Sequence, residues 1–157
     1  MGVLSKIISV EKIVSGGQTG VDRAALDAAM MLGFPIGGWC PKGRRAEDGK
    51  ISVRYKLQET EVIDYRVRTG WNVRDSDATL ILFTGKLSGG TKITLKFTRE
   101  QNKPCFTCNL DDENGLPNVV NWIFETRPKV LNIAGPRESG RPGIHEQAKQ
   151  FIIKVFH

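Results

Sequence analysis

Three junctions, in which an apolar run leads through glycines into a helical pattern, constrain the fold of this chain most strongly. A strand that is covered on both faces reads as a continuous apolar run. Glycines remove the Cβ atoms that would keep a ligand away from the backbone. Because parallel strands open their carboxyl ends on one edge of a sheet, the junctions predict one shared ligand site. They follow the runs 12–14, 78–83 and 130–134.

The first junction, Ser15-Gly-Gly-Gln-Thr-Gly-Val-Asp-Arg23, is the leading candidate for an anion site. It precedes an Ala-rich helical pattern, and the backbone N–H groups at a helix N-terminus favour a phosphate. A purely structural turn is the alternative, with Thr19 as the N-cap and Arg23 pairing with Asp27 across one helical turn. The spacing matches neither the dinucleotide fingerprint nor the P-loop.

The order of the segments along the chain predicts an α/β fold. Strands alternate with helices, which favours a mainly parallel sheet with right-handed crossovers and helices on both faces. We therefore expect one three-layer domain over residues 1–157 that binds an anionic or nucleotide-type ligand. The predicted strands are 12–15, 35–39, 78–83, 104–108 and 129–134, and the predicted helices are 20–32, 66–75, 90–102, 116–126 and 142–155.

Positive charge is concentrated in the segment 41–56. The chain has a net charge of +6, and in this segment the Lys and Arg residues clearly outnumber the two acids, Glu47 and Asp48. The segment follows a predicted strand, so it would overhang the carboxyl edge of the sheet and attract anionic ligands. A solvated loop without ligand contacts is an equal alternative. The cations that we assign to the site, as a lid or rim, are Lys42, Arg44 and Arg45.

Cysteine usage argues against a disulfide framework and against a metal site. Three cysteines, an odd number, fit a reducing cytoplasm, where we expect the protein to be. Cys105 and Cys108 have the C-x-x-C spacing of redox pairs, but a strand would point them to opposite faces. The chain offers no second paired set of zinc ligands, so no metal is expected. The apolar patch in residues 1–10 is too short to span a membrane, and no membrane contact is expected.

Catalytic residues are less well defined than binding residues. The chain has no G-x-S-x-G motif, and its one histidine inside the fold pattern, His145, reads as an exposed residue of the last helix. Asp22 and Glu138 lie at the predicted carboxyl edge and remain candidates for acid–base catalysis. Asp75 and Asp77, just before a buried strand, fit capping or turn contacts.

Five segments are specific enough to be compared with known families: Gly16-Gly-Gln-Thr-Gly-Val-Asp-Arg23, Gly38-Trp-Cys-Pro-Lys-Gly-Arg-Arg-Ala-Glu-Asp-Gly49, Asn72-Val-Arg-Asp-Ser-Asp-Ala78, Gly89-Gly-Thr91 and Leu131-Asn-Ile-Ala-Gly-Pro-Arg-Glu-Ser139. Together they resemble the molybdenum carrier family, proteins similar to the molybdenum cofactor carrier of algae, from about residue 12 to residue 156. That family is Rossmann-like and is related to the cytokinin-activating phosphoribohydrolases. The resemblance implies a parallel sheet, self-association as a dimer or tetramer, and a site for molybdopterin or a nucleotide-like phosphate ligand.

One departure from the wider group bears on catalysis. The phosphoribohydrolases carry a G-G-x-G-T-x-x-E signature, and placing Gly90 and Thr91 on its G-T puts Thr94 where the catalytic Glu belongs. Threonine cannot act as a carboxylate base. A carrier of molybdopterin or a nucleotide is therefore favoured over a nucleotide hydrolase with relocated carboxylates. A single-stranded nucleic-acid binder is the third reading, disfavoured because no row of aromatic residues accompanies the charge.

The predicted binding residues come from the three junctions and the basic segment. They are Gly16, Gly17, Gln18, Thr19 and Gly20 in the first junction, with Arg23, Lys42, Arg44 and Arg45 supplying charge, then Ser88, Gly89, Gly90 and Thr91 in the second junction, and Gly135, Arg137, Ser139 and Gly143 in the third.

Overall fold

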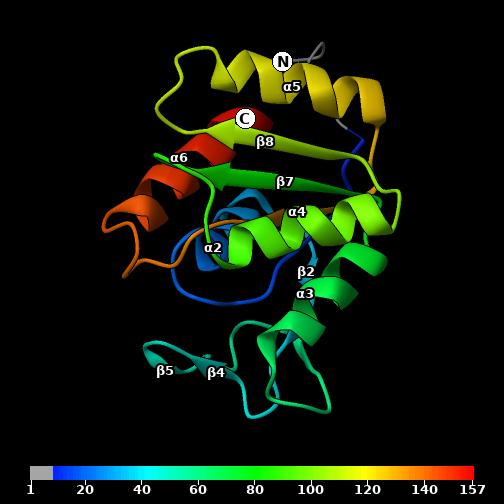
Figure 1. Cartoon of the computed structure of the whole chain (residues 1–157). Coiled ribbons are helices and arrows are strands. Elements are labelled where there is room, and N and C mark those ends of the chain that lie inside the picture. Colours follow the sequence, from blue (N-terminus) through cyan, green and yellow to red (C-terminus); the bar gives the residue numbers. More distant parts are fainter. Residues whose placement is uncertain (1–8) are drawn as a thin grey trace.

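A five-stranded parallel sheet forms the centre of the computed structural model, which describes residues 9–157 (Figure 1). The first eight residues of the predicted domain, with most of the N-terminal apolar patch, lie outside this range. The strand order is β2-β1-β9-β7-β8, and every neighbouring pair is parallel. The strands are β1 (Lys12–Val14), β2 (Ile36–Gly37), β7 (Ala78–Phe83), β8 (Cys105–Asn109) and β9 (Val130–Ala134).

Helices cover both faces of this sheet. On one face, α2 (Val21–Leu32) and α5 (Gly115–Thr126) both pack against α6 (Ile144–Phe156). On the other face, α3 (Tyr65–Arg74) packs against α4 (Gly90–Glu100), which crosses in front of the sheet in Figure 1. The predicted fold class, a Rossmann-like three-layer α/β domain with a mainly parallel sheet, is confirmed.

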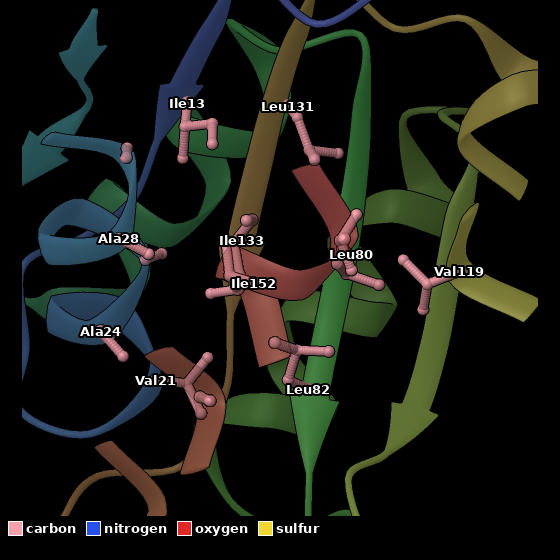
Figure 2. Close-up of a cluster of buried hydrophobic side chains, with 14 of the residues drawn as sticks. Ile13, Val21, Ala24, Ala28, Leu80, Leu82, Val119, Leu131, Ile133 and Ile152 are labelled. Atoms are coloured by element: carbon pink, nitrogen blue, oxygen red, sulfur yellow. The ribbon is translucent and has the colours of Figure 1, made fainter. Parts of the chain in front are cut away.

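One face of the sheet is apolar and the other carries buried polar groups. Leu80, Leu82 and Ile133 belong to the cluster that packs against α2, α5 and α6 (Figure 2). Side chains alternate along a strand, so Thr79 and Asn132 face α3 and α4. Both are buried, and the Asn132 Nδ2 donates a hydrogen bond of 3.2 Å to the Thr79 Oγ1. The layer beneath α3 and α4 is therefore suited to polar contacts.

The predicted strand 35–39 is divided at Gly38, which corrects the sequence-based assignment. Its first part, β2, joins the central sheet, whereas β3 (Trp39–Cys40) pairs with β6 (Gln58–Glu59) in a separate small sheet. Gly38 has a φ of +125°, and a Cβ atom there would lie 2.3 Å from the carbonyl oxygen of Ser15. Only glycine fits this position, so the chain leaves the central sheet here.

The predicted basic loop 41–56 is more ordered than expected. β4 (Arg45–Ala46) and β5 (Gly49–Lys50) form an antiparallel hairpin that stands apart from the central sheet in Figure 1. A second small core, which contains Leu26 of α2 together with Ile51 and Tyr55, holds this segment against α2. We call residues 41–60 the strap.

Of the two aspartates before β7, Asp75 lies at the end of a helix as predicted, whereas Asp77 makes a long-range contact instead of a local turn contact. Asp77 accepts hydrogen bonds from the backbone N–H groups of Lys129 and Val130, at 3.0 and 2.8 Å, and so ties the start of β7 to the start of β9. Asp75 ends α3 as its C-cap and accepts a hydrogen bond of 2.8 Å from the Trp39 Nε1.

The C-x-x-C pair points to opposite faces of β8, as predicted. Cys108 belongs to the apolar cluster, whereas Cys105 lies beside Thr98 of α4. Burial raises the pKa of both thiols, that of Cys108 to about 11, so both stay protonated at neutral pH. The three cysteines are free. Within residues 9–157 no cluster of His, Cys, Asp and Glu could hold a metal ion, and no helix is long and apolar enough to cross a membrane.

Candidate functional site

The three glycine junctions meet at the carboxyl edge of the sheet, around a pocket of about 320 Å³. From β1 the chain passes to β2 at one edge of the sheet, and from β7 it passes to β8 at the other. A ligand site is expected where the connections diverge in this way. We call this cavity the arginine pocket because Arg68, Arg137 and Arg141 line it.

A buried ion pair lies in the wall of the arginine pocket. The Nη1 of Arg68, on α3, donates a hydrogen bond of 3.0 Å to the Oδ2 of Asp22, in the first turn of α2. The two side chains are only 12% and 4% exposed. Burial raises the pKa of the Asp22 carboxyl, although Arg68 and the backbone N–H groups of Gln18 and Gly135 oppose that rise. Asp22 therefore takes up backbone donors that could otherwise serve a ligand.

Further backbone N–H groups in and just after the glycine turn 16–20 already have hydrogen-bond partners within the protein. The N–H of Thr19 bonds to the side chain of Gln18 at 3.1 Å, and the N–H of Val21 bonds to the carbonyl of Pro136 at 3.1 Å. The N-cap of α2 is Gly20, and no side chain within residues 9–157 caps it. The alternative with Thr19 as the N-cap is therefore wrong. Of this turn only Gln18 lines the arginine pocket.

The second junction places the N-terminus of α4 at the arginine pocket. Gly89 is the N-cap of α4, with no capping side chain in the described part of the chain. Ser88, Gly89, Gly90 and Thr91 all line the arginine pocket, as does Thr94. A helix N-terminus of this kind attracts negative charge.

The third junction contributes two arginines, one that is exposed and one that is bonded to the second junction. Arg137 is exposed, and its guanidinium lies 5.8 Å from the centre of the Tyr65 ring. Arg141 donates its Nε to the carbonyl of Thr84 at 3.1 Å, so it also joins the third junction to the second. Gly135 and Ser139 line the pocket beside them.

Glu138, a catalytic candidate from the sequence, caps a helix. Its carboxylate accepts hydrogen bonds from the backbone N–H groups of Gly143, at 2.6 Å, and His145, at 2.9 Å. These are the N-cap and an early residue of α6. The predicted site residue Gly143 therefore lies beside this cap, outside the arginine pocket.

The predicted cations of the strap do not line the arginine pocket. Arg44 donates hydrogen bonds to the carbonyls of Ile51, Ser52 and Tyr55, at 3.0, 2.7 and 2.8 Å, and so holds the strap together. Lys42 and Arg45 are exposed and lie outside the lining of the arginine pocket.

Arg23 also differs from its predicted pairing. Its guanidinium bonds to Asp48 of the strap at 2.8 Å instead of pairing with Asp27, and it donates to the carbonyl of Gly17 as well. Arg23 therefore fastens the hairpin of the strap to the glycine turn.

A second, wider groove of about 760 Å³ lies on the other side of Ser139. We call it the acidic groove because Asp27, Glu47, Asp48 and Glu138 line it, together with Thr19, Gly20, Arg23, Tyr55, Ser139 and His145. His145, expected to be exposed, is half-buried, and its Nε2 lies 2.8 Å from the Oδ2 of Asp27. Tyr55 donates its hydroxyl to the same carboxylate at 2.6 Å, and burial raises its pKa to about 12.

Sequence reasoning missed several residues of the arginine pocket, chiefly Tyr65, Arg68, Thr69 and Arg141. Among residues 9–157, the Nε of Arg68 is the one buried side-chain nitrogen or oxygen without a hydrogen-bond partner. Such an atom is costly in a folded protein and marks a place where a ligand or water would bind. The one available signal was Asp22, a carboxylate predicted at a helix start and in need of a buried partner.

The fold defines a Rossmann-like α/β protein. Its arginine pocket lies where the connections between the strands diverge, which is the usual place for a ligand in such sheets. The sequence profile of the circularly permutated YpsA SLOG family matches residues 13–156, so the chain belongs to this family.

The predicted resemblance to molybdenum carrier proteins is confirmed by a solved structure. The chain is similar to a protein of Syntrophus aciditrophicus SB named "Putative molybdenum carrier protein". The two share 43% sequence identity over 95% of this chain and 96% of that one, with a TM-score of 0.89. No curated protein shows a significant match to the chain.

Proposed function

We propose that this protein binds and carries a small phosphate-bearing anion in the arginine pocket, with the molybdenum cofactor, molybdopterin, as the leading ligand. The observation that carries the proposal is the meeting of Arg68, Arg137 and Arg141 with the uncapped N-terminus of α4. Guanidinium groups and helix N-termini both favour phosphate and similar oxoanions. The name of the 43% identical relative, a molybdenum carrier protein, supports a carrier role. Self-association, which the resemblance implies, stays a prediction.

The residues present fit the phosphate and the ring system of such a ligand. A volume of about 320 Å³ lies within the usual range for small-molecule sites. Arg68 lines the pocket, and Gly89 and Gly90 at the N-terminus of α4 line it without side chains in the way. Tyr65 adds an aromatic surface at the wall. These groups would bind and orient the ligand, and the carrier reading needs no chemical step. A nucleotide is the alternative ligand.

Titration of the purified protein tests the choice of ligand. We expect a pterin phosphate to bind more tightly than inorganic phosphate, molybdate or AMP, because phosphate and ring contacts then act together. Isothermal calorimetry gives the affinities, and native mass spectrometry identifies any small molecule that co-purifies. Tighter binding of AMP would move the proposal to a nucleotide, and no binding of any phosphate compound would overturn it.

Nucleotide hydrolysis is the second candidate, because Asp22 lines the arginine pocket and burial raises its pKa. Asp22 is already engaged by Arg68 at 3.0 Å, and Thr94 cannot supply a carboxylate. We therefore expect no release of free base from AMP or other nucleoside monophosphates, measured by chromatography beside an active phosphoribohydrolase. Turnover that disappears in Asp22→Asn, but persists in Glu138→Gln, would favour the hydrolase.

A further inference from the structure

The turn of the strap hairpin places one carboxylate between the first and third glycine junctions. Glu47 accepts a hydrogen bond of 3.1 Å from the backbone N–H of Ser139 and one of 2.5 Å from the Ser139 hydroxyl. It also accepts a hydrogen bond from the hydroxyl of Thr19. The Glu47 N–H in turn donates to the side chain of Gln18 at 2.8 Å. One exposed carboxylate thus collects three donors from two separate loops.

These donors favour a negative charge at this position. Hydrogen bonds from Ser139 and Thr19, and the nearby charge of Arg137, hold the pKa of Glu47 below its ordinary value. A backbone N–H and two hydroxyls that converge on one point also form the kind of site that binds a phosphate oxygen. The Thr19 hydroxyl is itself oriented, since it accepts the N–H of Glu138 at 3.3 Å.

The same place is the boundary between the two cavities. Ser139 lines both the arginine pocket and the acidic groove, whereas Thr19 and Glu47 line the groove. A group that replaced the Glu47 carboxylate would therefore lie next to an anion held in the arginine pocket. Arg137, which lines that pocket, already acts on Glu47 through its charge.

We propose that Thr19 and Ser139 form a second oxyanion subsite, which Glu47 closes in the free protein and which the second anionic group of a doubly anionic ligand takes over. The proposal rests on the proposed function, since the first anionic group occupies the arginine pocket. Binding of the second group displaces Glu47 and releases the hairpin. The hairpin turn is then held by the hydrogen bond from the Glu47 N–H to Gln18 and by Asp48 on Arg23, while the small core with Leu26 keeps the rest of the strap on α2. Asp48 is 50% exposed, so its ion pair contributes little.

The test compares inorganic phosphate with inorganic pyrophosphate, which carries two linked anionic groups. Glu47→Gln removes the competing charge, and Glu61→Gln is the matched control, an exposed carboxylate just beyond the strap. We expect Glu47→Gln to tighten pyrophosphate binding roughly two- to fivefold, the size of an exposed charge interaction, with less gain for phosphate. Glu61→Gln should change neither affinity.

Amide hydrogen exchange of residues 45–50 measures the release of the hairpin independently of the ligand affinity. We expect faster exchange in free Glu47→Gln than in the wild type, and faster exchange in the wild type when pyrophosphate, but not phosphate, is added. Equal gains for both probes, or hairpin exchange that never changes, would overturn the subsite while leaving the arginine pocket intact. Failure of both probes to bind the wild type would overturn the proposed function and the subsite together.

Discussion

Replacing Arg68 with Met is expected to destabilise the fold by about 3–5 kcal/mol, the usual loss when one partner of a buried ion pair is removed. Asp22 would lose the guanidinium that faces it, in a site where its side chain is only 4% exposed. Urea unfolding at neutral pH measures the loss. The double variant Asp22→Asn with Arg68→Met should be more stable than the sum of the single changes predicts, because it leaves no unpaired charge.

The pH dependence of the stability lost in Arg68→Met shows how much of the loss is due to charge and how much to packing. Burial raises the pKa of Asp22 above its ordinary value, and removal of Arg68 raises it further. A carboxyl whose pKa is raised by folding binds its proton more readily in the folded state, so stability falls as the pH rises between the unfolded and folded values. The loss in Arg68→Met should therefore shrink from neutral pH toward roughly pH 4. An equal loss at both pH values would show that packing, not charge, is responsible.

Removing Arg137 is expected to weaken phosphate binding by about 1.5–3 kcal/mol, roughly ten- to a hundredfold, as for other charge-assisted hydrogen bonds. The fold should tolerate Arg137→Ala, because this side chain is exposed and packs over the ring of Tyr65. Calorimetry with inorganic phosphate measures the change, and thermal unfolding checks the fold.

Arg45→Ala is the matched control for this experiment. Arg45 is equally an exposed arginine and was assigned to the site from the sequence, but it lies on the strap outside the arginine pocket. We expect a small loss that disappears at higher salt, because only long-range attraction is removed. Equal losses in the two variants would mean that the net charge of the edge, not a built pocket, holds the anion.

The strands and their junctions were predictable because the signals are local. The run 78–83 is apolar except for Thr79 and forms β7 with the predicted bounds, since a strand covered on both faces has a nearly continuous apolar sequence. The second and third junctions then follow from chain order, and Ser88, Gly89, Gly135 and Arg137 do line one pocket.

The sequence could not predict which backbone N–H groups remain free to bind a ligand, because their partners within the protein are residues far along the chain. Whether the glycine turn 16–20 presents its N–H groups is decided by Asp22 and by the carbonyl of Pro136, which is far along the chain. Arg68 and Asp22 are separated by 46 positions, and no periodicity links them. Composition placed the cations of segment 41–56 at the site, whereas the fold brings Glu47 and Asp48 to the neighbouring acidic groove, where they bond to Ser139 and Arg23.

The departure of the chain at Gly38 has a consequence for the two cavities. The strap packs on α2 through a small core that includes Leu26, and its strand β6 pairs with β3 outside the central sheet. Glu47, Asp48 and Tyr55 of the strap line the acidic groove, whereas no residue of the strap lines the arginine pocket. A substitution in the strap can therefore change the charge and shape of the acidic groove while the central sheet and the three arginines keep their places.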